Sequence, residues 1–123
     1  MNPFGYSEPV WRLFTEPLHA GMLEGSRVLI GRSATPANRN RLELRVLMKA
    51  ERIADARFQA YGCPATIAVG AWLCERAIGG TLEDLSAIRA REIRQALEIP
   101  EDRHHCALLG EDAVQSLCRS DSK

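Results

Sequence analysis

The stretch over residues 64–78 constrains the fold most, because it is apolar on nearly every side of a helix. A helix with so little polar surface must be covered on most sides, so the rest of the chain has to pack around it. Pro64 suits the first position of such a helix, and Gly79–Gly80 suit its C-terminal stop. We therefore expect a central buried helix over 64–78.

Three extended segments precede this helix, at residues 27–31, 42–49 and 53–61. The second alternates strictly, with apolar residues on one face and charged residues on the other. The turn between the second and third segments is short enough for a hairpin, so we expect an antiparallel sheet. A short helix over 6–16, capped by Ser7, comes before the sheet.

Shorter helices follow the central one. Thr81 and Asp84 resemble a capping box for a helix over 82–87. Further helices are expected over 90–97 and 104–119. Strands first and helices after indicate the α+β class, with a three-stranded antiparallel sheet packed against four to five helices. At 123 residues, the chain fits a single domain spanning 1–123.

Composition narrows the classes of partner. Sixteen basic and sixteen acidic side chains balance to zero, which argues against a general nucleic-acid binder or a binder of acidic membranes. The same balance leaves little repulsion between copies, so a homo-oligomer is compatible with the sequence. No apolar run reaches the length of a membrane span, and the Met1 end lacks a signal-peptide pattern. These features indicate a cytoplasmic protein with reduced cysteines.

Cys63 and the pair His105–Cys106 carry the strongest chemical signal. Cys63 stands where the central helix begins, and Cys106 falls in the first turn of the last helix. Helix N-termini favour thiolates, and two thiolates with an imidazole suit zinc or an iron–sulfur cluster. The alternative is that both cysteines pack as small apolar residues. Cys74 and Cys118 lie on apolar helix faces and are interpreted as core residues.

Several motifs resemble the IscU/NifU-type scaffold proteins of iron–sulfur cluster assembly. Residues 55–63, DARFQAYGC, are similar to that family's "DARFKxxGC" segment, and residues 105–113, HCALLGEDA, to its "HCSxLAEDA" segment. Residues 6–8 and 80–83 resemble its "YSE" and "GKTLEE" segments. The motifs occur in the family's order and span nearly the whole chain.

The resemblance implies a transient cluster, or iron, held by three cysteines with an aspartate and a histidine nearby. It also implies a cysteine desulfurase as the source of sulfur. By position, Cys63 and Cys106 match the second and third cysteines, and His105 matches the histidine. These are the predicted metal-binding residues, with the two cysteines as cofactor ligands, and no catalytic residue is expected.

Two segments depart from the family. The loop "GxPxCGD", which holds the first cysteine and the aspartate, is here residues 31–38, with Thr35 or Pro36 in place of the cysteine and Asn38 in place of the aspartate. None of these is a good iron or zinc ligand. The stretch that an Hsp70-type chaperone recognises, "LPPVK", is here residues 99–103 and keeps only the proline. The substitutions argue against docking of that chaperone.

Three functions remain open from the sequence. The leading hypothesis is a non-enzymatic iron–sulfur assembly scaffold with a reduced ligand set. The second is an interaction or regulatory module of the assembly machinery that has lost cluster binding. The third is a zinc protein that uses Cys63, His105, Cys106 and one external ligand. A thiol enzyme with His105 as base is disfavoured, because neighbours on a helix point about 100° apart.

Overall fold

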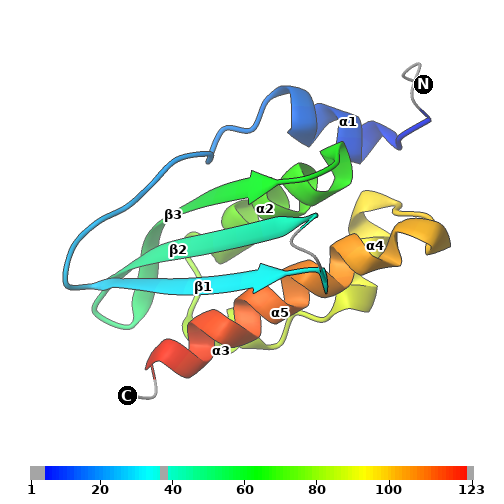
Figure 1. Ribbon diagram of the computed structural model, residues 1–123. Coiled ribbons are helices and arrows are strands. Elements are labelled where there is room, and N and C mark those ends of the chain that lie inside the picture. Colours follow the sequence, from blue (N-terminus) through cyan, green and yellow to red (C-terminus); the bar gives the residue numbers. More distant parts are fainter. Residues whose placement is uncertain (1–4, 37–38, 122–123) are drawn as a thin grey trace.

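The computed structural model describes residues 5–36 and 39–121. Within these residues a three-stranded antiparallel sheet packs with five α-helices, which confirms the predicted α+β class (Figure 1). The elements in chain order are α1 Glu8–Thr15, β1 Val28–Ala34, β2 Arg41–Lys49, β3 Arg52–Tyr61, α2 Pro64–Ala77, α3 Leu82–Ser86, α4 Ala90–Leu97, the 3-10 helix η2 Glu101–Arg103, and α5 His104–Asp121.

The sheet has the order β1-β2-β3, with β2 in the middle. In its register Leu44 of β2 lies opposite Gly31 of β1 and Phe58 of β3. The predicted alternation is confirmed, because Leu42, Leu44 and Val46 are all buried. Their common face is therefore the one that the helices cover.

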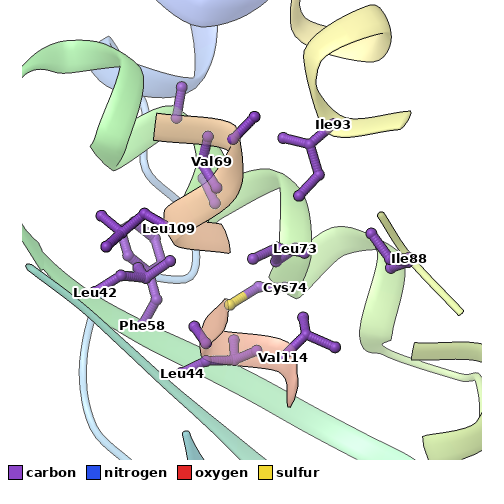
Figure 2. Packing of buried hydrophobic residues seen from close by; sticks show 14 of the residues in the cluster. Leu42, Leu44, Phe58, Val69, Leu73, Cys74, Ile88, Ile93, Leu109 and Val114 are labelled. Carbon is purple, nitrogen blue, oxygen red and sulfur yellow. The ribbon is translucent and has the colours of Figure 1, made fainter. Parts of the chain in front are cut away.

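Helices α2 and α5 both lie against this apolar face. Gly31 approaches α5 at Leu117, while Phe58 approaches α2 at Gly70. Since Gly31 and Phe58 share one row of the sheet, the two helices cover the same side. Figure 2 shows how their side chains meet those of the sheet in one core, where Leu42, Leu44 and Phe58 of the sheet lie beside Val69, Leu73, Cys74, Leu109 and Val114 of the helices.

Close approach between α5 and its neighbours depends on two glycines. A Cβ at Gly31 would lie 2.2 Å from the Ala113 carbonyl oxygen, and one at Gly110 would lie 2.5 Å from Val69 Cγ1. Real Cβ atoms do not approach other atoms this closely, so any side chain would push α5 away. These two positions fix where the start of α5, and with it Cys106, lies.

The structure confirms the two helix caps that the sequence predicted. Ser7 accepts a hydrogen bond from the Val10 amide and caps α1, and the Thr81–Asp84 capping box is complete. Strand β1, predicted to end at residue 31, continues to Ala34. Tertiary contacts explain this extension, because the Arg32 amide donates to Ser116 Oγ and the Ser33 hydroxyl donates to the Leu109 carbonyl.

The segment that follows α1 runs along the outer edge of β3. The Phe58 amide donates to the His19 carbonyl, and the Gly21 amide donates to the Phe58 carbonyl. No helix in residues 5–36 and 39–121 is long and apolar enough to cross a bilayer.

Candidate functional site

Two helix starts bring Cys63 and Cys106 into contact. Cys63 follows β3 as the N-cap of α2, with extended backbone and Pro64 behind it, and Cys106 lies in the first turn of α5. Their sulfur atoms are 3.6 Å apart. Both thiols are free, as are Cys74 and Cys118. The structure thus joins the two cysteines that the sequence singled out.

The two thiols differ in exposure and in proton affinity. Cys63 is partly exposed, while Cys106 is fully buried (0%). The Cys106 thiol donates to Cys63, which holds the pKa of Cys63 well below its usual value, and Thr66 adds to this effect. The same hydrogen bond and burial raise the pKa of Cys106. Ionisation of the pair is therefore favoured at Cys63 over Cys106.

A polar pair that the sequence did not single out supports the thiols. Thr66 is buried (0%), and its hydroxyl lies 3.5 Å from Cys106 Sγ and 3.6 Å from Cys63 Sγ. The same hydroxyl lies 3.0 Å from Asn40 Oδ1, a third possible acceptor for its one proton, and that oxygen also accepts from the Cys63 amide at 3.3 Å. Asn40 thus ties the β1–β2 loop to the start of α2. Thr66, a polar residue in the mostly apolar first half of α2, was a signal for a buried polar group, but nothing in the sequence pointed to its pairing with Asn40.

Gly62 makes room for Asn40. A Cβ at this position would lie 2.1 Å from Asn40 Oδ1, and the backbone has a φ of +145°, which L side chains rarely adopt. A glycine at position 62 therefore allows the hydrogen bond between the Cys63 amide and Asn40 Oδ1 to form.

The described residues between β1 and β2, 35–36 and 39–40, and the end of β1 before them supply no evident metal ligand to the thiols. Arg32, Ser33 and Ala34 belong to β1. Thr35 closes the loop onto Asn40, with its amide donating to the Asn40 carbonyl at 2.9 Å and its hydroxyl accepting from the Asn40 amide at 3.0 Å. Pro36 is exposed. Asn38, which stands at the place of the family's aspartate, lies outside the described residues.

His105 does not join the thiols. It is exposed at the start of α5, and within the described ranges no three His, Cys, Asp or Glu side chains come together as a metal-binding group. The reason is helical geometry: successive residues point about 100° apart, so a buried Cys106 turns His105 away. The structure assembles two of the three predicted ligands.

The fold and the site together define a small α+β domain that presents two contacting thiols at the starts of two helices. Residues 5–119 match the family described as NifU-like N terminal domain. The chain therefore belongs to that family, as its motifs predicted.

Individual relatives agree with this assignment. The chain is 33% identical over 114 residues to the iron–sulfur cluster assembly scaffold protein IscU of Haemophilus influenzae, with 90% of each covered. It is 35% identical over 114 residues to the nitrogen fixation protein NifU of Azotobacter chroococcum mcd 1, but it spans only 37% of that longer relative.

Solved structures show the same fold. A putative iron–sulfur cluster assembly scaffold protein from Fervidobacterium islandicum AW-1 superposes with a TM-score of 0.74 at 18% identity, covering 92% of this chain and 96% of that one. The N-terminal part of a NifU-like protein from Brucella abortus gives 0.60 at 17% identity, covering 94% and 82%.

Proposed function

We propose that this chain is a non-enzymatic scaffold of iron–sulfur cluster assembly that holds iron or a nascent cluster on Cys63 and Cys106. The observation that carries the proposal is the distance of 3.6 Å between the two sulfur atoms. Two thiolates bound to one tetrahedral ion at about 2.3 Å are separated by about 3.8 Å. A shift of a few tenths of an ångström therefore suffices for both sulfurs to bind the same ion.

An ion bound by the two sulfurs needs further ligands from outside the thiol pair. His105 is the proposed nitrogen ligand, because it is exposed next to Cys106; its binding requires the first turn of α5 to unwind so that the imidazole turns toward the thiols. Water or a small thiol can occupy further positions. Zinc accepts the same two sulfurs with the same geometry, so a zinc-bound form belongs to this proposal.

A cysteine desulfurase is the proposed sulfur donor, because relatives of this chain are named as scaffold proteins of the assembly process. The partly exposed Cys63 is the thiol that such a donor can reach. We do not expect an Hsp70-type chaperone to dock at η2, because Glu101 and Asp102 are exposed there and replace neutral residues of the recognised motif. Four free thiols fit a reducing compartment such as the cytoplasm.

A second candidate function is a regulatory module that binds the assembly machinery without metal. The observation in its favour is that no group of three potential ligands forms within the described parts of the chain. This candidate predicts that the protein co-purifies with a desulfurase while its metal content stays near zero.

Anaerobic reconstitution with ferrous iron and sulfide tests the scaffold proposal. The expected product is coloured, with thiolate-to-iron absorption that Cys106→Ala abolishes. Cys118→Ser is the matched control, because it removes a thiol distant from the site and should leave the absorption unchanged. A colourless, iron-free product from the unaltered chain would overturn the proposal and leave the regulatory module as the better account.

A further inference from the structure

We propose that Cys63 and Cys106 also act as a thiol–disulfide couple that exchanges with small-molecule disulfides. In this exchange Cys63 attacks first and Cys106 resolves the mixed disulfide into an internal one. The proposal rests on the contact between the two sulfurs and on their unequal exposure, and it requires no metal.

The geometry is close to that of a bonded pair. Sulfur atoms 3.6 Å apart are in non-bonded contact, and a disulfide brings them to about 2.05 Å. The side chains have to close roughly 1.6 Å, and each stands at a helix start, Cys63 as an N-cap and Cys106 in the first turn. Forming the bond therefore requires side-chain rotation at these ends together with an adjustment of the first turns.

The other two cysteines are not placed for this chemistry. Cys74 is fully buried (0%) in the core between α2 and the sheet. Cys118 lies near the C-terminal end of α5, with its sulfur 4.0 Å from the Leu82 carbonyl. The Cys63–Cys106 contact is the only approach between two sulfurs that the described cysteines make.

Exposure sets the order of attack. A small disulfide can reach Cys63, which is partly exposed, but not Cys106, which has no exposed surface. The Cys63 thiolate attacks one sulfur of the disulfide RSSR, so that a mixed disulfide forms and one RS⁻ leaves. Cys106 then gives its proton to water or to that thiolate and attacks Cys63 Sγ, and the second RS⁻ leaves. In sum two protein thiols are oxidised and RSSR is reduced to two RSH.

Thr66 assists the resolving step. Its hydroxyl is within 3.6 Å of both sulfurs, so it can donate to whichever sulfur carries the negative charge. Because the internal disulfide uses both sulfurs, the oxidised chain cannot bind a metal through them. Oxidation would thus remove the ligands on which the proposed scaffold function depends.

Mass spectrometry of the metal-free full chain after incubation with oxidised glutathione tests the couple. The unaltered chain should lose two hydrogens and yield a Cys63–Cys106 linked peptide, with no lasting glutathione adduct. Cys106→Ser should instead accumulate one glutathione on Cys63, and Cys63→Ser should react at neither site. Cys118→Ser serves as the control and should behave like the unaltered chain at the pair.

Three results would overturn the couple: a lasting adduct on Cys63 of the unaltered chain, no reaction at all, or an adduct on Cys106 of Cys63→Ser. Circular dichroism of each variant identifies any loss of fold. The linked peptide from the unaltered chain decides the question without any variant. Failure of iron reconstitution would not affect this test, so the two proposals fail separately.

Discussion

Thr66 and Asn40 are not expected metal ligands, but their hydrogen bonds affect the position and the ionisation of the two thiols. The Thr66 hydroxyl has one proton and three neighbours that can accept it: Asn40 Oδ1, Cys63 Sγ and Cys106 Sγ. With Cys63 ionised, a sulfur is the more charged acceptor, and hydrogen bonds to charged groups are the stronger ones. The residue therefore stabilises the thiolate form of Cys63, in agreement with the lowered pKa of this thiol.

We expect Thr66→Val to raise the pKa of Cys63. The valine keeps the shape of threonine but removes one hydrogen bond to a charged group, worth about 1.5–3 kcal/mol, or roughly one to two pH units. The pKa of Cys63 is lowered to about 4, so a rise of roughly one to two pH units lowers the thiolate fraction mainly at acidic pH. Alkylation of Cys63 by iodoacetamide should therefore slow at acidic pH and be little changed at neutral pH and above. Peptide-resolved mass spectrometry of the rate against pH measures the shift.

Thr66→Ser is the matched control, because it keeps the hydroxyl and should retain the pH profile of the unaltered chain. Cys74 provides an internal reference, since burial raises its pKa to about 12 and should keep it unmodified in the folded chain throughout. Identical profiles for the valine and serine variants would show that the Thr66 hydroxyl does not contribute to the lowered pKa of Cys63.

Individual site residues differ in how far the sequence could predict them. Cys63 and Cys106 were predictable, because each stands at a helix start within a recognisable motif. The outward position of His105 follows from the 100° step of a helix, but the motif alone suggested a ligand. Thr66 and Asn40 depend on contact between a loop and a helix that are far apart in the chain, so no local pattern shows their pairing.

At the scale of elements, the position of α5 on β1 determines where Cys106 lies. The helix rests on Gly31 so closely that a Cβ there would be 2.6 Å from Leu117 Cβ and 2.7 Å from the Leu117 amide nitrogen. Backbone atoms cannot move aside as the end of a flexible side chain can. One methyl group at residue 31 must therefore displace the whole helix.

Gly31→Ala is accordingly expected to destabilise the fold by about 1–3 kcal/mol, the usual cost of overpacking a filled core. Chemical denaturation should show this as a lower midpoint with an unchanged slope. Gly80→Ala is the matched control, because the nearest atom to its new Cβ would be 3.4 Å away at Asp84 Oδ2. Equal midpoints for the two variants would mean that α5 can shift without cost.

The bounds of β2 and α3 could be predicted from local sequence patterns, whereas the end of β1 could not. Strict alternation defined β2, and the Thr81–Asp84 pair located α3 to within a residue. The end of β1 was missed because Arg32, Ser33 and Ala34 have no alternating apolar pattern. Ser116 and the Leu109 carbonyl, both on α5, hold that end in place, and such contacts exist only once the helix has docked.

At the scale of the whole molecule, distant parts of the chain meet around the thiol pair. The β1–β2 loop contributes Asn40, and the start of α2 contributes Cys63 and Thr66. Arg103 of η2 lies over the Tyr6 ring at 4.8 Å, and its positive charge acts on Cys106. The two sulfurs come together only in the folded chain. A ligand that bridges them would therefore bind the native state and not the unfolded state, and would stabilise the fold.

Metal binding at the pair should consequently raise the melting temperature. A ligand present at 100 times its Kd adds about 2.7 kcal/mol to the stability of the native state, which for a domain of this size corresponds to roughly 5–15 °C. Zinc under anaerobic conditions is the probe, and calorimetry or circular dichroism is the measurement. Cys118→Ser should keep the shift, while Cys106→Ser and the chain oxidised at Cys63–Cys106 should lose it. A shift of equal size in Cys106→Ser would place the metal away from the two thiols, because a site that uses both sulfurs cannot tolerate the loss of one.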